Sequence, residues 1–403
     1  MKVIITPKKL SGDITPPASK SQAHRLMIAA ALSEGTSVIT RLSRSQDIDA
    51  TLSCMTALGA KAQWLNEDTL RLEGGKAEGD GILDCGESGS TLRFLIPVAL
   101  AVRGKGTFKG RGRLMERPQE PYFEIFREKG IAYAREGDTL TLEGRLTPGV
   151  YRLPGNVSSQ FVTGLLYALP LLPGDSEIRL TTDLESKGYV DMTLEALSAY
   201  GVAVEVTEGG YKVPGNQKYT PRDMAVESDY SQAGFFFAAK GCGSDIRILG
   251  LNQNSVQGDR IVEDYMAKLN EPGDVVLDVR ECPDLVPPLA ARAALRQGKT
   301  HIVGAARLRM KESDRLQTVT DVLRKLGADI LEEPEGLIIT GKDRLTGGEV
   351  DAWGDHRIAM MAAVAATGCE NPVTLTGAEN VKKSYPTFWE DYEALGGIVR
   401  YES

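Results

Sequence analysis

The sequence predicts an α/β protein made of two similar halves, each built from three copies of one structural unit. Two observations carry this prediction. An apolar helical run ends at a glycine turn and leads into a strand six times along the 403-residue chain. The turns recur at roughly 70 residues, with one shorter interval, which is typical of a repeat architecture. The turn glycines are Gly35, Gly106, Gly174, Gly243, Gly298 and Gly368.

Each copy is expected to contain two helices and a closing hairpin. The apolar helix with its following strand covers 25–40, 92–108, 161–180, 235–249, 285–303 and 356–375. Amphipathic second helices, with apolar residues three and four apart, are expected at 47–60, 121–130, 189–201, 260–269, 315–327 and 386–396. Several of them stop at a glycine, as helix C-termini often do. Alternating segments such as AQWL and TLRLEG then indicate hairpin strands, so the unit is βαβαββ-like.

The sixth copy ends at GGIVRYES, one hairpin strand short. The first strand of the chain, KVIITP, resembles LIITG at Leu337–Gly341, which closes the fifth copy. We therefore expect the N-terminus to complete the sixth copy, with crossings between the halves near 15–18 and 225–228. The expected domains are 1–18 with 229–403, and 19–228. The alternative is one long α/β domain of unrelated segments.

The composition narrows the classes of function. A net charge of −8, from 47 Lys plus Arg against 55 Asp plus Glu, argues against a nucleic-acid or membrane-surface binder. The five cysteines form no CxxC pair and there are only three histidines, so no metal site is expected and a reducing cytoplasmic compartment fits best. No apolar stretch is long enough for a signal peptide or a membrane span.

Polar clusters precede or open the buried helices, where unpaired N–H groups attract anions. Each cluster alone could be a solvated helix start or an ordinary cap. Together they contain more cations than one monoanion needs, which indicates two substrates bearing phosphate or carboxylate. Asp284 and Glu312 are the candidates for proton transfer in this setting. The clusters lie at 20–25, 87–93, 113–118 with 158–160, 311–315, and 355–357 with 284 and 382–383.

Six segments, KSQAHR, GESGSTLR, LMERP, SSQF, RMKESDRL and GDHRIAM, together resemble the 5-enolpyruvylshikimate-3-phosphate synthase family over essentially the whole chain. The resemblance implies two domains of three βαβαββ repeats each, of the inside-out α/β barrel type, closing around an interdomain cleft. It also implies transfer of the carboxyvinyl group of phosphoenolpyruvate to the 5-hydroxyl of shikimate 3-phosphate, releasing phosphate through a tetrahedral intermediate, without metal or organic cofactor. The pathway implied is aromatic amino-acid biosynthesis.

The resemblance also implies roles for particular residues. Asp284 would accept the 5-hydroxyl proton, while Glu312 or Lys20 would protonate the enol. The shikimate 3-phosphate contacts would be Lys20, Ser21, Arg25, Ser158, Ser159, Gln160, Ser186, Tyr189, Asp284 and Lys311. The phosphoenolpyruvate contacts would be Lys20, Gly89, Arg117, Gln160, Arg315, Arg357 and Lys383.

Two residues depart from the family pattern. Glu87 stands where many relatives have Asn, and a carboxylate there is costly beside phosphoenolpyruvate, so it is left out of the contacts. Arg307 stands where some relatives have an Asn that touches the shikimate phosphate. Gly89 is the small residue associated with glyphosate sensitivity in the family. It predicts inhibition competitive with phosphoenolpyruvate.

Two other functions compete. The sister enzyme that acts on UDP-N-acetylglucosamine shares the fold, but it usually carries a reactive cysteine near the segment that is 103–117 here, and this chain has none there. The other alternative is an inert anion-binding module, which loss of Lys20, Asp284 or Glu312 would have indicated. We also expect a monomer, since internal repetition supplies the mating surfaces. Repulsion among the cations should favour an open form without ligands.

Overall fold

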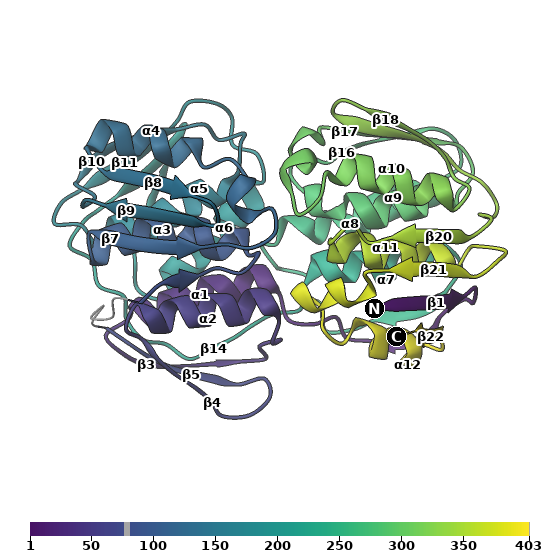
Figure 1. Cartoon of the computed structure of the whole chain (residues 1–403), viewed down its shortest axis with the longest axis horizontal. Helices are drawn as coiled ribbons and strands as arrows, with labels where there is room; N and C mark the ends of the chain where they lie inside the picture. The colour runs from purple at the N-terminus through teal and green to yellow at the C-terminus, as the bar shows by residue number, and fades with distance from the viewer. Residues whose placement is uncertain (76–80, 403) are drawn as a thin grey trace. The chain divides into compact units, whose positions relative to one another are not determined.

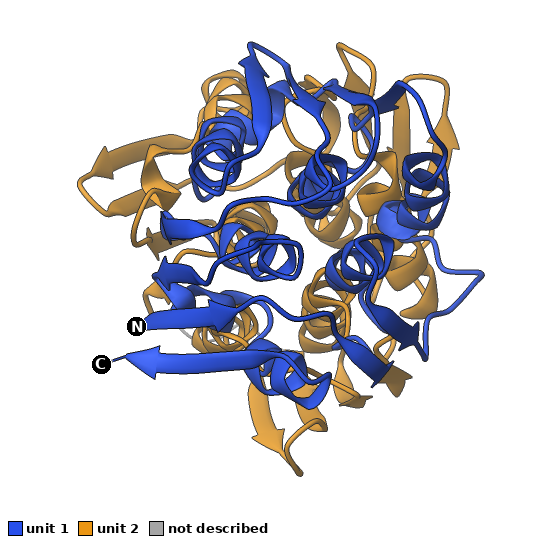
Figure 2. Cartoon of the chain, turned by 90° about the vertical axis from the view of Figure 1, so that its right-hand side faces the viewer, with its two compact units in different colours: residues 1–17, 228–403 blue, residues 18–227 orange. Residues whose placement is uncertain are grey.

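The computed structural model describes residues 1–75 and 81–402. The chain divides into two compact units, Met1–Pro17 with Ser228–Ser403 (unit 1) and Ala18–Glu227 (unit 2), coloured blue and orange in Figure 2. The domain bounds expected from the sequence stay a prediction. No helix in the described residues is long and apolar enough to cross a membrane.

The described residues of unit 2 form three four-stranded sheets of one topology. In each sheet, two neighbouring strands are parallel, and an antiparallel hairpin follows the inner one of them in sequence. The later strand of the hairpin pairs antiparallel with that inner strand, and the earlier strand of the hairpin lies at the edge of the sheet. The second repeat is β6 (Leu83–Asp84), α3 (Gly89–Val102), β7 (Lys105–Lys109), α4 (Glu120–Lys129), β8 (Ala132–Glu136) and β9 (Thr139–Glu143). The third is β10 (Gly149–Leu153), α5 (Ser159–Ala168), β11 (Ser176–Leu180), α6 (Lys187–Ala199), β12 (Glu205–Thr207) and β13 (Gly210–Val213).

The first repeat takes its opening strand from the far end of unit 2. It consists of α1 (Lys20–Leu32), β3 (Gly35–Thr40), α2 (Gln46–Ala57), β4 (Lys61–Trp64) and β5 (Leu70–Gly74). The parallel partner of β3 is β14 (Met224–Ala225), with Met224 opposite Ile39. The returning chain therefore closes this sheet before it leaves unit 2.

Unit 1 contains two full repeats, and the N-terminal strand completes the last one, as the sequence predicted. The fifth repeat is β16 (Val275–Asp278), α9 (Val286–Ala294), β17 (Lys299–Val303), α10 (Arg315–Lys325), β18 (Asp329–Glu333) and β19 (Gly336–Thr340). The sixth is β20 (Gly348–Asp351), α11 (His356–Ala366), β21 (Val373–Thr376), α12 (Phe388–Ala394), β22 (Ile398–Glu402) and β1 (Lys2–Thr6). Lys2 stands opposite both Thr376 and Glu402, so β1 lies between β21 and β22 (Figure 1).

The fourth repeat corrects the expectation that every copy ends in a hairpin. It has β2 (Ser11–Ile14), α7 (Tyr230–Gly241), β15 (Asp245–Ile248) and α8 (Val262–Asn270). Its sheet has two strands, and only residues 271–274 separate α8 from β16 of the next repeat. The missing hairpin accounts for the short interval between Gly243 and Gly298.

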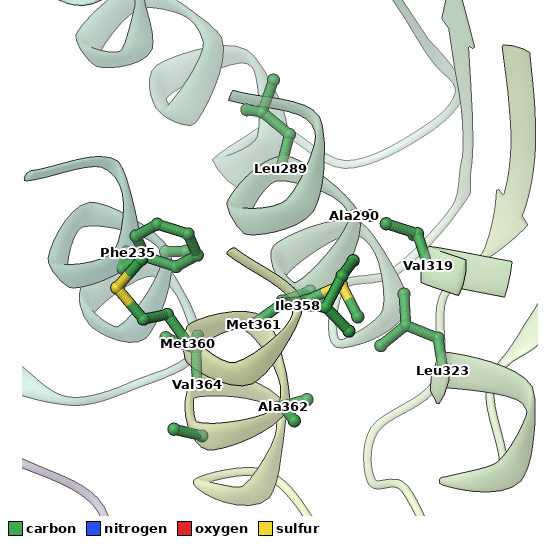
Figure 3. Close-up of a cluster of buried hydrophobic side chains, with 14 of the residues drawn as sticks. Phe235, Leu289, Ala290, Val319, Leu323, Ile358, Met360, Met361, Ala362 and Val364 are labelled. Atoms are coloured by element: carbon green, nitrogen blue, oxygen red, sulfur yellow. The ribbon is translucent and has the colours of Figure 1, made fainter. Parts of the chain in front are cut away.

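The core of unit 1 surrounds α11, which is apolar on all sides after its first turn. Every residue from His356 to Ala366 is buried. Helices α7, α9 and α10 pack around it, and Figure 3 shows side chains of α7, α9 and α10 gathered about Ile358, Met360 and Met361. A helix that is apolar all round belongs inside the protein. Its polar first turn is thereby held at one end of the core, where charged side chains can gather.

Candidate active site

In unit 1, three segments that are distant in sequence bring their charges together. Asp284 lies in a short turn before α9, Arg315 begins α10, and Arg357 lies in the first turn of α11. The two helix starts are capped by Asp314 and Asp355, whose carboxylates accept backbone N–H bonds. These caps orient the side chains of the first helical turns.

Arg315 is the centre of this cluster. Its guanidinium donates to Asp284 Oδ1 at 2.8 Å, to Glu312 Oε2 at 2.6 Å and to Asp355 Oδ2 at 2.8 Å. Lys311 Nζ lies 3.2 Å from Asp284 Oδ1, and Arg357 Nη2 lies 3.3 Å from Asp284 Oδ2. Asp284 is thus surrounded by three cations, all contributed by unit 1.

The charges determine which protonation state these groups hold. Burial alone would raise the pKa of Asp284, but the charges of Arg357, Lys311 and Arg315 together hold it well below its ordinary value. Burial lowers the pKa of Lys311, although Asp284 opposes that change. Arg315 is buried too, yet its three carboxylate neighbours raise its pKa. Asp284 is therefore a carboxylate at neutral pH, able to accept a proton.

Lys383 joins the same end of the core through a neighbouring loop. It is 7% exposed, and its Nζ donates to the carbonyl of Gly354 at 2.7 Å, directly before the cap Asp355. The next residue, Ser384, accepts a bond from Gln232 Nε2 on α7 at 3.1 Å. The predicted site residues of unit 1 thus lie in two linked groups. One is Lys383, and the other contains Asp284, Lys311, Glu312, Arg315 and Arg357.

Within unit 1, the cations are balanced by carboxylates. Arg315, Lys311 and Arg357 each have a carboxylate partner within unit 1. Opposite charges at these distances attract, so no net repulsion arises inside this cluster. Repulsion within unit 1 therefore gives no reason for an open form.

In unit 2, a second group of predicted residues lies between α1 and α6. Arg25 Nη1 donates to the carbonyl of Ser21 at 2.6 Å, and its Nη2 donates to the carbonyl of Tyr189 at 2.8 Å. Ser186, the residue before α6, has a left-handed backbone (φ 58°), and its carbonyl accepts a bond from Tyr189 N at 3.1 Å. Burial lowers the pKa of Arg25 to about 10. The bonded partners of Arg25 are neutral.

Lys20 and His24 face the other way, toward α2. Lys20 Nζ lies 2.6 Å from Asp47 Oδ2, and His24 Nδ1 lies 2.7 Å from Thr51 Oγ1. Burial, and then the charges of Lys20 and Arg25, hold the pKa of His24 well below its ordinary value. Lys20 and His24 therefore lie on one face of α1, and Ser21 and Arg25 on another.

A third group surrounds the start of α5. Ser158 caps this helix and accepts from Gln160 N at 3.3 Å, with Ser159 as the first helical residue. Gln160 accepts from Arg93 Nη1 at 2.9 Å and donates to Ser90 Oγ at 3.1 Å. A Cβ added at Gly89 would lie 2.9 Å from Arg117 Nη1 and 3.5 Å from Gln160 Oε1. Glycine at position 89 therefore allows this close approach.

Sequence reasoning missed two partners. Asp47 follows the cap of α2 in the first helical turn, a common place for an acidic residue, and nothing in the pattern linked it to Lys20. Asp355 was noted only as a charge, whereas its carboxylate is completely buried against Arg315. Of the departures, Arg307 donates to the carbonyl of Arg280, and Glu87 lies beside Gly112.

Comparison with known proteins identifies the family of the whole chain. A family model described as EPSP synthase (3-phosphoshikimate 1-carboxyvinyltransferase) matches residues 4–392. The chain belongs to the EPSP synthase family. A 3-phosphoshikimate 1-carboxyvinyltransferase of Clostridium perfringens strain 13 is 46% identical, with 100% of both chains covered. The enzyme of the same name from Clostridium acetobutylicum is 46% identical, with 98% of both covered.

Solved structures of the family have the same fold. The EPSP synthase of Acinetobacter baumannii, at 2.37 Å, is similar with a TM-score of 0.82 and 26% identity, covering 99% of this chain and 100% of that one. A second structure of EPSP synthase from that organism gives a TM-score of 0.81 at 25% identity, covering 100% of both. Membership of the EPSP synthase family thus extends over the whole chain, both units included.

Proposed function

We propose that this chain transfers the carboxyvinyl group of phosphoenolpyruvate to the 5-hydroxyl of shikimate 3-phosphate and releases phosphate. The family and the names of its 44–46% identical relatives support this reaction. The structural observation that carries it is Asp284, a carboxylate held among Arg315, Lys311 and Arg357. Such a group is suited to deprotonate an alcohol while neighbouring cations hold an anionic substrate.

The proposed shikimate 3-phosphate contacts use two groups of side chains. Asp284 and Lys311 come from unit 1, and Asp284 takes the 5-hydroxyl proton as the new C–O bond forms. The contacts from unit 2 are Lys20, Ser21, Arg25, Ser158, Ser159, Gln160, Ser186 and Tyr189. Arg25 supports this assignment best, because its buried charge has neutral partners and a phosphate would supply the counter-charge.

Phosphoenolpyruvate is proposed to contact both units as well. Arg315, Arg357 and Lys383 contribute from unit 1, with Lys20, Gly89, Arg117 and Gln160 from unit 2. Gly89 supports this assignment, because its missing side chain lets Arg117 Nη1 and Gln160 Oε1, two of the proposed contacts, lie close to its backbone. Fixed cations favour the phosphate as it leaves.

The reaction also needs a proton at the methylene carbon of phosphoenolpyruvate. The 5-oxygen adds to C2 while C3 gains a proton, giving a tetrahedral intermediate that still bears phosphate. Phosphate then leaves from C2, and C3 loses a proton to restore the double bond. Glu312 and Lys20 are both proposed for this proton transfer, and each has a charged partner, Arg315 and Asp47.

We further propose that the two compact units are the domains of this enzyme and that it acts as a cytoplasmic monomer. Because Asp284 and the cations supply the base and the charge, the proposed reaction uses neither a metal nor an organic cofactor. No nucleic-acid or membrane partner is proposed. Glyphosate is proposed to compete with phosphoenolpyruvate.

The test is phosphate release from purified protein given both substrates, with each omitted in turn. The expected result is release only when both are present, with one enolpyruvyl product detected by mass spectrometry for each phosphate. UDP-N-acetylglucosamine in place of shikimate 3-phosphate tests the sister activity. No release from folded protein with either acceptor would favour an inert anion-binding module.

A further inference from the structure

Four buried side chains in unit 2 form a continuous hydrogen-bond chain. His24 Nδ1 lies 2.7 Å from Thr51 Oγ1, and Thr51 Oγ1 lies 2.6 Å from Thr91 Oγ1. The hydroxyl of Thr91 then donates to Ser88 Oγ at 2.7 Å. His24 is on α1, Thr51 on α2 and Thr91 near the start of α3, so the chain links three helices.

All hydrogen bonds of this series must point the same way from donor to acceptor, because each hydroxyl has a single proton to donate. Thr91 gives its proton to Ser88, so it must accept the bond from Thr51. Thr51 has then used its own proton and can only accept at His24. His24 must therefore carry a proton on Nδ1.

The other ring nitrogen of His24 has a different environment. Nε2 is buried and has no hydrogen-bond partner among the described residues, and the His24 ring stands at 90° to that of Phe94, with centroids 6.5 Å apart. A second proton at Nε2 would place an unpaired positive charge in a buried position beside Lys20 and Arg25. Burial first, and then those two charges, already depress the pKa of His24. The surroundings therefore select the neutral ring.

This hydrogen-bond chain begins one helical turn after Lys20, a predicted active-site residue. Lys20 precedes His24 by four residues, and Asp47 precedes Thr51 by four, so the 2.6 Å Lys20–Asp47 pair and the His24–Thr51 bond are successive rungs between α1 and α2. At its other end, Ser88 caps α3 immediately before Gly89. A further bond, from Cys54 Sγ on α2 to the carbonyl of Asp84 at 3.3 Å, holds the segment before this cap.

We propose that His24, as a neutral imidazole protonated on Nδ1, is a positioning residue that holds Lys20 and the Gly89 turn in register through Thr51, Thr91 and Ser88. The proposal rests on the proposed function, since Gly89 is a proposed contact of phosphoenolpyruvate and Lys20 a proposed contact of both substrates. Ser21 and Arg25 depend instead on α6, where Arg25 Nε donates to Thr193 Oγ1 at 2.9 Å. Loss of this hydrogen-bond chain should therefore lower kcat/KM for phosphoenolpyruvate more than kcat/KM for shikimate 3-phosphate.

The first test is spectroscopic and independent of catalysis. Long-range ¹H–¹⁵N spectra of histidine-labelled protein, with the His24 signals assigned by the variant His24→Asn, report which ring nitrogen carries the proton. We expect the Nδ1–H form, unchanged between about pH 5.5 and 8.5. Protonation at Nε2, or a charged ring in this range, would overturn the proposal.

The second test compares substitutions along the chain. In His24→Asn the amide nitrogen stands the same number of bonds from Cβ as Nδ1, so it can still donate to Thr51. We expect its kcat/KM for phosphoenolpyruvate to stay within about threefold of the parent, while His24→Leu and Thr51→Val lose on the order of a hundredfold. Thr51→Ser keeps the hydroxyl and should restore the activity.

A matched control lies on the other side of α1. Thr163 Oγ1 lies 2.9 Å from Thr193 Oγ1, which accepts the bond from Arg25. Thr163→Val also removes one buried hydroxyl, but it should raise the KM for shikimate 3-phosphate instead. Equal effects of Thr51→Val and Thr163→Val on both substrates would mean general loosening and would overturn the proposal. Absence of activity in the parent protein would refute the proposed function, leaving the tautomer result intact.

Discussion

Arg315 in unit 1 and Arg25 in unit 2 are buried almost equally, at 1% and 2% exposed. Their partners differ. Arg315 is bonded to three carboxylates, whereas Arg25 is bonded to two backbone carbonyls and the hydroxyl of Thr193. The pKa of Arg315 is raised, and burial lowers the pKa of Arg25 to about 10.

The difference teaches that one fold can hold a buried cation in two ways. Three carboxylates stabilise the charge of Arg315 without any ligand. Neutral acceptors satisfy the N–H groups of Arg25 but leave its charge uncompensated, so an incoming anion gains more from it. We infer that the unit 1 cluster is rigid before substrate binds, while Arg25 supplies attraction for a phosphate.

The largest expected effect concerns the role of carboxylates in the two units. Asp284→Asn removes the proposed base, so kcat should fall about a thousandfold, as loss of a general base typically costs 10²–10⁴. Asp47→Asn in unit 2 is the matched control. It leaves an amide oxygen for Lys20, and we expect about a tenfold loss. Steady-state phosphate release measures kcat for both variants. Equal losses of kcat would show that Asp284 does no more than Asp47, which only pairs with a cation.

The two buried arginines should also differ in how much they contribute to the free energy of unfolding. Arg315→Met removes the cation that three carboxylates share, among them the completely buried Asp355, and should lower the free energy of unfolding by about 3–5 kcal/mol. Arg25→Met removes a charge that has no carboxylate partner and leaves only neutral acceptors unpaired, so it should cost about 1 kcal/mol. Urea unfolding followed by circular dichroism measures both. A loss for Arg25→Met as large as that for Arg315→Met would contradict the comparison.

The stabilising contributions of buried titratable groups in the two units should be lost in different ranges of pH. The pKa of His24 is depressed in the folded protein, so the unfolded chain takes up this proton first as the pH falls. The contribution of His24 to stability is therefore complete above about pH 6.5 and decreases below it, by up to about 1.4 kcal/mol per pH unit. Asp284 and Asp355 also have depressed pKa values, but their contributions are complete above about pH 4 and are lost only at lower pH.

Urea unfolding at pH 7.5, 6.5 and 5.5 tests this separation. The parent protein should lose stability steadily below pH 6.5, and His24→Asn should lose less, since Asn has no proton to gain. An identical pH dependence in the two proteins would show that His24 is not the group responsible. Asp355→Asn should leave the slope between pH 5.5 and 7.5 unchanged.

The smallest expected effect concerns Gly89. The added methyl of Gly89→Ala would lie 2.9 Å from the flexible end of Arg117, which can move aside. We expect the KM for phosphoenolpyruvate to rise about tenfold, equivalent to about 1.4 kcal/mol, with a larger rise in the inhibition constant of glyphosate. The KM for shikimate 3-phosphate should stay within about twofold. A rise in both KM values would place the effect of Gly89 elsewhere than at the phosphoenolpyruvate contacts.

Periodic features of the chain were predictable because they are local. Apolar spacing and turn glycines identified the repeats, and the likeness of KVIITP to LIITG correctly predicted that β1 completes the sixth sheet. The absent hairpin of the fourth repeat was not predicted, although the short glycine interval was a visible signal. The direction of pairing between α1 and α2, which joins Lys20 to Asp47, could not be read from either helix alone.

The sequence by itself determined the repeat, the family and the candidate residues, since these depend on order and spacing along the chain. Only the tertiary structure decided the partners: Asp355 under Arg315, neutral oxygens around Arg25, and Thr51 at His24. Partner choice depends on how helices pack through their side chains, which sequence spacing does not encode. The charge balance of each cluster follows from that packing, and it determines which protons are available for chemistry.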